Sequence, residues 1–334
     1  MRDVNRQIVI ARLPTDRLAV EHFASREGPM PEPADGEVLC RTRLLSIDAA
    51  NRAWMQGATY RAPIEGGQVM DGGTLAEVVT SRDDRFAPGD IVEASGGWQD
   101  YAVQRGSLLR KVDVRGPLSH HLSVLGITGL TAYFGLHRVG RPVAGETVLV
   151  SAAAGATGNV VGQLAKLAGC RAVGVVGNDD KGRFLTEELG YDAAVSHRDP
   201  DLRGALKRAC PDGVDVFFDN TGGPVLEAAL SRMNQGGRIA CCGVVSQYDT
   251  SSPASGPKGV PGLLVTKRLR MEGFIVMDYF AERDAAETEL ARAVAAGELK
   301  VVEDVVDGLE SAPAALVGLL AGDNLGKRMV RVSN

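Results

Sequence analysis

A short loop with three glycines, set between an apolar run and a helical pattern, constrains the fold of this chain more than any other feature. Residues 146–151 are a largely apolar run, and residues 159–168 repeat apolar side chains at helical spacing. Gly155, Gly158 and Gly162 lie between the two patterns and in the first helical turns. A strand, a glycine loop and a helix in this order predict a tight turn whose helix N-terminus faces an anionic ligand.

The three glycines have separate expected roles. We expect Gly155 to permit the tight turn, Gly158 to let the backbone approach a pyrophosphate, and Gly162 to allow close packing of the helix against the strand. Ala156 and Thr157 complete the phosphate-binding loop. The alternative interpretation is a tight turn of an α/β domain that binds nothing.

Two patterns of secondary structure divide the chain. Residues 1–122 contain short strands separated by Gly and Pro turns, which are typical of a compact β barrel or sandwich. In residues 123–300 apolar strands alternate with helices, which predicts an α/β fold with a doubly wound parallel sheet. The tail, 301–334, returns to the β pattern. We therefore expect 1–122 and 301–334 to form one domain, which 123–300 interrupts as a second.

Charge and hydropathy exclude several classes of protein. The 334 residues carry a formal charge of -5, which argues against nucleic-acid binding and against a polybasic membrane surface. No apolar run reaches the roughly 18 residues of a membrane helix, and the first residues lack a signal-peptide core. We expect a cytoplasmic protein.

Neither the cysteines nor the histidines predict a metal site. The five cysteines are scattered and no pair has CxxC spacing. Cys241 and Cys242 are adjacent in an apolar run, so we expect small buried side chains rather than redox groups. No ligand spacing is formed by the histidines, which are His22, His120, His121, His137 and His197.

The residues after the next predicted strand bear on which dinucleotide would bind. An acid roughly 20 residues beyond the loop usually holds the ribose 2′-OH of NAD. Here Asn178 falls nearest that position, and Asp179 and Asp180 follow it. Lys181 could pair with a 2′-phosphate, and either acid could cap the following helix. The spacing favours NADP over NAD.

Six segments share their order and residues with a known family. They are 129–136 (GLTAYFGL), the glycine loop, 219–223 (DNTGG), 242–248 (CGVVSQY), 270–276 (RMEGFIV) and 322–327 (GDNLGK). In these segments the chain resembles the zinc-free branch of the medium-chain dehydrogenase/reductase superfamily. The closest resemblance is to its prostaglandin reductase, curcumin reductase and alkenal double-bond reductase group.

The resemblance implies a GroES-like β domain and a Rossmann domain with a cleft between them. It also implies NADPH as cofactor, no zinc, and a homodimer. Tyr248 matches the residue that the family uses beside nicotinamide and substrate, although alone it would read as an ordinary loop tyrosine. Around the cofactor, besides the glycine loop and Asn178, the expected residues are Thr131, Lys181, His197, Asn220, Gly243, Phe274, Val276 and Asn324.

Some positions depart from the family pattern. His197 stands where the family often has a tyrosine, so either His197 or the adjacent Arg198 would contact the 2′-phosphate. After Ser46-Ile-Asp48 the family commonly has a Pro-Tyr-Met-Arg run, which this chain lacks. We therefore expect the rim of the substrate pocket to differ from that of the family and to include Asn51, Trp54 and Tyr60. The alternative is that these side chains pack in the core.

These observations give a leading interpretation and two rivals. The leading one is NADPH-dependent reduction of the activated double bond of an enone or enal. A developing enolate needs a hydrogen-bond donor, and a tyrosine phenol with a pKa of about 10 stays protonated at neutral pH. The first rival is a quinone oxidoreductase, and the second is a non-catalytic NADPH-binding sensor or structural protein.

Overall fold

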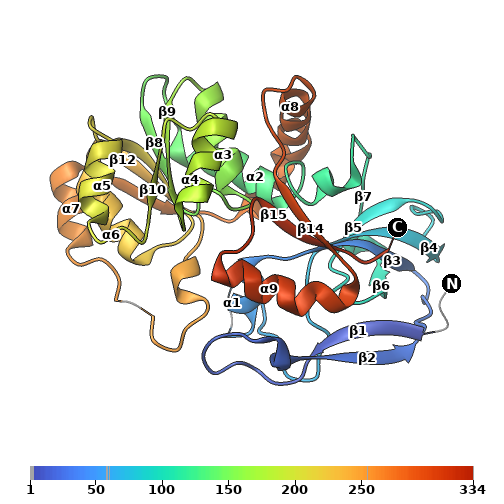
Figure 1. Ribbon diagram of the computed structural model, residues 1–334. Coiled ribbons are helices and arrows are strands. Elements are labelled where there is room, and N and C mark those ends of the chain that lie inside the picture. Colours follow the sequence, from blue (N-terminus) through green and yellow to red (C-terminus); the bar gives the residue numbers. More distant parts are fainter. Residues whose placement is uncertain (1–3, 58, 60, 254, 334) are drawn as a thin grey trace.

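The structure is a computed structural model that describes residues 4–57, 59, 61–253 and 255–333. Two lobes lie side by side, and each contains its own sheet (Figure 1). The blue N-terminal strands and the red C-terminal elements share one lobe, and the green to orange elements form most of the other. Among the described residues, no helix combines the length and the apolar character needed to cross a bilayer.

The second lobe is a Rossmann domain with six parallel strands in the order β10-β9-β8-β11-β12-β13. This order confirms the predicted doubly wound sheet. The strands are β8 (Thr147–Val150), β9 (Arg171–Val176), β10 (Ala193–Ser196), β11 (Val214–Asp219), β12 (Met233–Cys241) and β13 (Arg270–Gly273).

Helices cover both faces of this sheet because consecutive strand side chains point to opposite sides. Val148 and Val150 lie in a core with α2, α3, α4 and α8, whereas Leu149 lies in a core with α5, α6 and α7. The first group is α2 (Ile127–Phe134), α3 (Gly158–Leu167), α4 (Asp179–Glu188) and α8 (Arg283–Ala295). The second is α5 (Leu202–Ala209), α6 (Gly223–Arg232) and α7 (Val260–Lys267).

The first lobe is the GroES-like domain, with a seven-stranded sheet and a separate strand pair. The sheet order is β14-β15-β3-β4-β5-β7, and β6 also pairs with β3. Its strands are β3 (Glu37–Ser46), β4 (Thr74–Ser81), β5 (Ile91–Ala94), β6 (Tyr101–Arg105), β7 (Arg110–Lys111), β14 (Glu303–Asp307) and β15 (Lys327–Arg331). The separate pair is β1 (Val4–Ile10) with β2 (Phe23–Pro29), and the helices are α1 (Ala49–Trp54) and α9 (Ala312–Ala321).

The C-terminal tail lies within the first lobe. β15 pairs antiparallel with β3, and the buried ammonium of Lys327 donates to the carbonyl of Ile47 at 2.7 Å and to Asp48 at 2.8 Å. This pairing supports the proposed division into 1–122 with 301–334 and 123–300. The sequence patterns assigned the whole tail to β structure and so missed α9.

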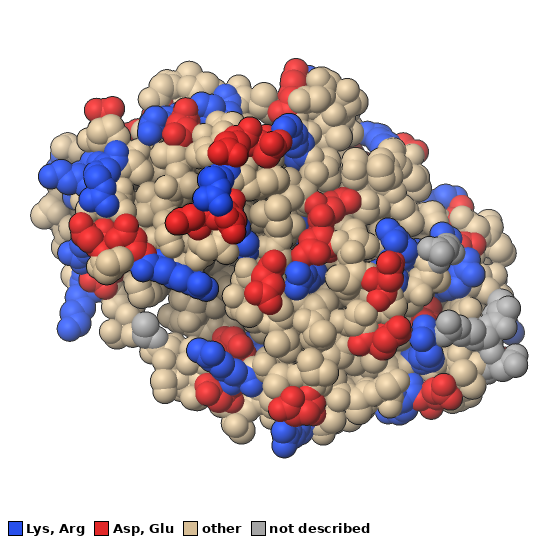
Figure 2. Space-filling view, viewed as in Figure 1, with Lys and Arg blue, Asp and Glu red and all other residues tan. Residues whose placement is uncertain are grey.

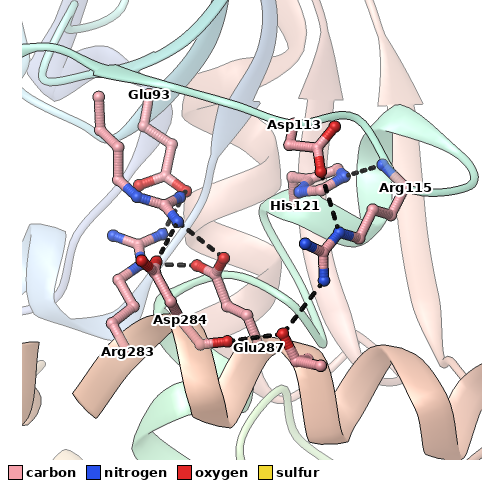
Figure 3. A network of polar contacts seen from close by, with 9 residues as sticks. Glu93, Asp113, Arg115, His121, Arg283, Asp284 and Glu287 are labelled. Carbon is pink, nitrogen blue, oxygen red and sulfur yellow. Dashed lines mark hydrogen bonds and ion pairs between the residues drawn. The ribbon is translucent and has the colours of Figure 1, made fainter.

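A network of charged side chains joins the two lobes on the side of β7 and α8 (Figure 3). Arg110 of β7 bonds to Glu287 at 2.8 Å and to Asp284 at 3.2 Å, both on α8. Arg283 of the same helix reaches back to Glu93 of β5. The lobes are therefore connected at a place apart from the glycine loop.

Candidate functional site

The candidate site lies at the carboxyl ends of β8 and β11, where the strand order reverses. Ser151, directly after β8, donates from Oγ to Asp219 Oδ1 at 2.9 Å and accepts from the Asn220 N–H at 2.8 Å. The Asn220 amide returns a bond to the Ser151 carbonyl at 2.7 Å. Burial raises the pKa of Asp219, although backbone N–H groups of Thr221 and Gly222 oppose this. Such a switch point is where open α/β sheets bind ligands.

The glycine loop runs from this switch point to the start of α3. The loop turn closes with a bond from the Gly155 N–H to the Ala152 carbonyl at 2.9 Å, and Ala152 has a left-handed φ of 48°. A Cβ at Gly158 would lie 2.4 Å from the Ala152 oxygen. The close approach that requires Gly158 is thus to the loop itself. In the described structure the side chain of Thr157 does not cap α3, so the helix N-terminus stays open to a ligand.

Gly162 packs against a side chain rather than against a strand. A Cβ at Gly162 would lie 1.8 Å from Cζ of Tyr191 and 2.1 Å from its hydroxyl oxygen. The buried Tyr191 donates to the Gly158 carbonyl at 2.6 Å. We expected Gly162 to pack directly against a strand, and this was wrong. The Tyr191 ring fills the space between α3 and the sheet, so Gly162 packs against that ring.

The C-terminal segment after α9 lies against the glycine loop. Gly326 forms an isolated parallel β-bridge with Gly155, and the Gly326 N–H donates to the Ala154 carbonyl at 2.8 Å. Asn324 is buried and donates to the Gly326 carbonyl at 2.9 Å. Lys181, in the first turn of α4, donates to the carbonyls of Gly322 and Asn324, each at 2.6 Å. Lys181, Asn324 and the loop therefore meet in one corner of the cleft.

Three basic residues lie around the ends of β9 and β10. Nε2 of His197 would be 3.7 Å from a Cβ on Gly177, at the end of β9. Burial lowers the pKa of His197, and the charge of Arg198 lowers it further. Burial also lowers the pKa of Lys181. Within the described residues the Arg198 guanidinium has no ion pair, so it is available to an anion.

The cap of α4 differs from our expectation. Asn178, and neither Asp179 nor Asp180, is the capping residue, and its Oδ1 accepts from the Lys181 N–H at 3.0 Å. The two acids occupy the first helical turn, where the positive end of the helix dipole stabilises them. The Asn178 oxygen is thus already engaged with the helix.

Tyr248 follows a short 3-10 turn, η5 (Val245–Gln247), after β12. Its hydroxyl lies 3.4 Å from the Val244 nitrogen, and a Cβ on Gly243 would be 3.8 Å from that hydroxyl. The same Cβ would be 3.2 Å from the Asn220 carbonyl oxygen. The structure therefore brings Tyr248, Gly243 and Asn220 together at the ends of β11 and β12.

Three other predicted cofactor residues make contacts within the Rossmann domain. Phe274 meets Phe218 edge-on at 6.1 Å between centroids, and its ring would contact a Cβ at Gly135. Val276 is 6% exposed and belongs to the Rossmann core. Thr131 donates to the Ile127 carbonyl at 2.6 Å within α2. Phe274 and Val276 thus take part in packing, and their expected contact with the cofactor stays a prediction.

The predicted pocket rim on α1 is only partly available. Asn51 is fully buried; its Oδ1 accepts from the Asp48 N–H at 2.8 Å and its Nδ2 donates to the Asp71 carbonyl at 2.9 Å. Assigning Asn51 to the rim was wrong, because both ends of its amide hold α1 in place. Trp54 is 9% exposed, with the guanidinium of Arg61 4.3 Å from its ring centroid. Tyr60 lies outside the described residues.

Two further observations concern metals and thiols. Across the described ranges, no group of three or more His, Cys, Asp or Glu side chains has a geometry that could hold a metal ion. Burial raises the pKa of Cys241 to about 11 and of Cys242 to about 12. Both thiols are therefore protonated at neutral pH and poorly reactive.

The surface is hollowed between the two lobes, and basic side chains lie beside the hollow (Figure 2). Figure 1 shows the long segment after β12 beside the first lobe on this side. This segment carries Tyr248, so it crosses from the Rossmann domain toward the first lobe.

Comparison with known proteins matches both lobes. Residues 6–112 match a family described as the N-terminal domain of oxidoreductase, and residues 156–295 match the zinc-binding dehydrogenase family. The chain is 40% identical to an NADPH-dependent curcumin reductase of Escherichia coli, covering 98% of this chain and 97% of the relative. It is 42% identical to an NADP-dependent 2-alkenal reductase of Nicotiana tabacum, covering 91% and 89%.

A solved structure has the same fold throughout. The CurA structure from Vibrio vulnificus in complex with NADPH superposes with a TM-score of 0.94 at 38% identity. The superposition covers 98% of this chain and 99% of that one.

Proposed function

This chain belongs to the zinc-free group of the medium-chain dehydrogenase/reductase superfamily, and we propose that it reduces the activated double bond of α,β-unsaturated ketones or aldehydes. It is an NADP-dependent oxidoreductase and a reductase of the curcumin, alkenal and prostaglandin reductase type. The enone or enal substrate and the role of Tyr248 are the proposal. The observation that carries it is the position of the Tyr248 hydroxyl beside Gly243 and Asn220 at the switch-point edge.

The residues of the cleft fit a phosphorylated dinucleotide. The open N-terminus of α3 suits the pyrophosphate, because its N–H groups and helix dipole attract anions. At the far end, Lys181 and Arg198 supply the positive charge that a 2′-phosphate requires, and the imidazole of His197, whose lowered pKa keeps it neutral, offers a hydrogen bond. Asn220, beside Tyr248 at the ends of β11 and β12, would hold the nicotinamide half, and Asn324, next to Lys181, would lie nearer the phosphates. When bound, NADPH supplies the hydride that reaches the β-carbon of the substrate.

The residues of the chain must stabilise the negative charge that develops on the substrate. As the β-carbon becomes reduced, negative charge accumulates on the carbonyl oxygen, and a preorganised donor there lowers the barrier. Tyr248 Oη is the donor that we assign to this oxygen. A proton from solvent then adds to the α-carbon, which converts the enolate to the saturated carbonyl product. Trp54, with Arg61 over its ring, would border the apolar side of the substrate.

No metal is required in this scheme, and the residues around the site do not offer one a ligand set. An alcohol oxidation that needs a Lewis acid would require a cluster of His, Cys or carboxylate side chains, and the described part of the chain lacks such a cluster. The five cysteines are free thiols, which suits the reducing cytoplasm where we propose that the protein acts.

We also propose that the protein forms a homodimer through the edge of the Rossmann sheet. β13 is an edge strand, and apolar side chains on and after it are exposed, including Met271, Ile275 and Met277. An exposed edge with apolar side chains pairs readily with another copy of itself.

The decisive experiment is a titration with NADPH and NADH, followed by turnover of a panel of enones, enals and quinones. We expect NADPH to bind more tightly and the enones and enals to be reduced. If the protein reduces quinones but not enones or enals, it is a quinone oxidoreductase and the proposed function is wrong. Tight NADPH binding without turnover of any of the three classes would favour a sensor or structural protein.

A further inference from the structure

The loop that carries Tyr248 is attached to both domains. On the Rossmann side, the Val245 N–H donates to the Asn220 carbonyl at 3.2 Å. Ser246 donates twice to the Thr221 carbonyl, from its N–H at 3.2 Å and from its Oγ at 2.6 Å. These bonds fix the loop just before Tyr248 to the end of β11.

The second attachment begins at the residue after Tyr248 and crosses the cleft. Oδ1 of Asp249 accepts from the Leu18 N–H at 2.7 Å and from Arg52 Nε at 3.0 Å. Two residues further on, the Ser251 N–H donates to the Asp16 carboxylate at 2.8 Å. Tyr248 therefore lies between an anchor on the Rossmann domain and an anchor on the GroES-like domain.

Arg52 is a rigid partner for this crossing. It belongs to α1, is 2% exposed, and donates from Nη2 to the Asp16 carbonyl at 2.7 Å. Its Nη1 is buried and has no hydrogen-bond partner among the described residues. A buried guanidinium without a counter-charge is strongly unfavourable, and Asp249 supplies that charge. The ion pair therefore holds Asp249, and with it the adjoining peptide, in one place.

We propose that Arg52 and Asp249 are positioning residues that hold the Tyr248 hydroxyl at the reacting oxygen of the substrate. This inference rests on the proposed role of Tyr248. The carboxylate of Asp249 is fixed to the domain on the opposite side of the cleft, so the tyrosine is aligned by both domains at once. Preorganisation of this kind matters because small displacements of a donor cost large factors in rate.

The pair has a more specific effect than joining the domains. The lobes are also joined by Arg110 with Glu287 and by Lys181 with Asn324, at places that do not involve the Tyr248 loop. Loss of Asp249 would leave those contacts intact. The expected consequence is thus a misplaced hydroxyl in a folded enzyme that still binds NADPH.

A double-mutant cycle on the full chain tests this, using Asp249→Ala, Tyr248→Phe and the double variant. We expect Asp249→Ala to lower kcat for an enone about tenfold, with KM for NADPH changed less than about twofold. In the Tyr248→Phe background, the same change should cost less than about twofold, because the group that it positions is already gone. Asp249→Asn keeps an oxygen acceptor for Leu18 and Arg52 but removes the negative charge, so it should restore only part of the rate.

Arg110→Gln is the matched control, because it removes an interdomain ion pair away from Tyr248 and should retain the wild-type kcat. Thermal unfolding of every variant checks that it is folded. An equal loss from Asp249→Ala in both backgrounds, or a wild-type rate in the single variant, would overturn the inference while leaving the proposed function standing. A full-rate Tyr248→Phe variant would overturn both.

Discussion

The ammonium of Lys181 lies 2.6 Å from the carbonyl oxygen of Asn324, so helix α4 of the Rossmann domain is tied to the segment that precedes β15. The same ammonium donates a second hydrogen bond to the Gly322 carbonyl, also at 2.6 Å. An ammonium group has three donors, so one remains for an anion. This lysine therefore joins the domains and supplies charge where the 2′-phosphate is proposed to bind.

Replacement of Lys181 by Gln should weaken NADPH much more than NADH. A hydrogen bond to a charged group contributes about 1.5–3 kcal/mol, so we expect KM for NADPH to rise roughly 10- to 100-fold. KM for NADH should change less than about threefold, since its ribose carries a hydroxyl instead of the phosphate. Steady-state kinetics with both cofactors gives the ratio.

Lys166→Gln is the control for that experiment. Lys166 lies on the neighbouring helix α3 and pairs with Asp192 at 2.9 Å, so the change removes a lysine ion pair of the same domain. It should leave both KM values unchanged. An equal rise in the two KM values for Lys181→Gln would mean that the lysine acts only through the interdomain contact.

Tyr248→Phe should lower kcat for enones about 100-fold, in the range seen when one oxyanion donor is removed. The dissociation constant for NADPH should stay nearly unchanged, because the substitution removes only the hydroxyl. Stopped-flow measurement of NADPH oxidation separates the chemical step from binding. A variant with full rate would remove the tyrosine from the proposed mechanism.

The sequence predicted the parts of the site that depend on local spacing. The strand, glycine loop and helix around Gly155 and Gly158 were predicted correctly, because backbone period and glycine content are local properties. The buried position of Asn51 was not, because a buried amide and a rim amide look the same in sequence. Arg52 and Asp249 are 197 residues apart, and no local pattern signals that they pair.

Helix α9 shows a different limit of the sequence. Its residues are almost uniformly apolar or small, so they lack the polar face whose period indicates an amphipathic helix. The helix is stabilised by packing of Ala312, Ala315 and Leu316 in the core of the GroES-like domain. That core forms only once the tail has joined the N-terminal strands.

The unfolding free energy should fall as the pH drops from about 7 to 5. Burial lowers the pKa of two histidines, His121 and His137. In the unfolded chain these histidines have ordinary pKa values near 6.5, so near that pH the unfolded chain binds more protons than the folded one. Each additional proton bound by the unfolded chain lowers the free energy of unfolding by about 1.4 kcal/mol for every pH unit of acidification. Their stabilising effect is present above pH 6.5 and is lost below it.

His121 allows a direct test of this pH dependence. Its Nε2 accepts from the Arg115 N–H at 2.9 Å (Figure 3), a bond that protonation of that nitrogen abolishes. The nearby charges act in both directions, since Glu287 raises its pKa whereas His120 and Arg110 lower it. In urea unfolding at pH 7.5 and 5.5, His121→Gln should lose less stability than the wild type. An unchanged pH slope would exclude this histidine as a contributor.

Lysine substitutions at the β13 edge should dissociate the proposed dimer. Met271 and Ile275 are each 37% exposed, so a charge at either position is tolerated in a monomer but is desolvated in an interface. We expect Met271→Lys/Ile275→Lys to halve the mass measured by light scattering. Leu108→Lys, at a residue 70% exposed in the other lobe, should leave it unchanged. A wild-type protein of monomeric mass would contradict the dimer.

Two glycine-to-alanine substitutions, each within a helix, should have opposite effects on stability. In α3, the new methyl of Gly162→Ala would lie 1.8 Å from Cζ of Tyr191, whose ring is 3% exposed and whose hydroxyl is bonded to Gly158. Because the ring cannot move without breaking that bond, we expect a loss of about 1–3 kcal/mol. In α7, a Cβ at Gly262 would meet nothing within 4 Å, so the gain in helix propensity should stabilise the protein by up to about 1 kcal/mol. Urea unfolding of both variants measures the difference, and equal effects would show that Tyr191 yields freely to the added methyl.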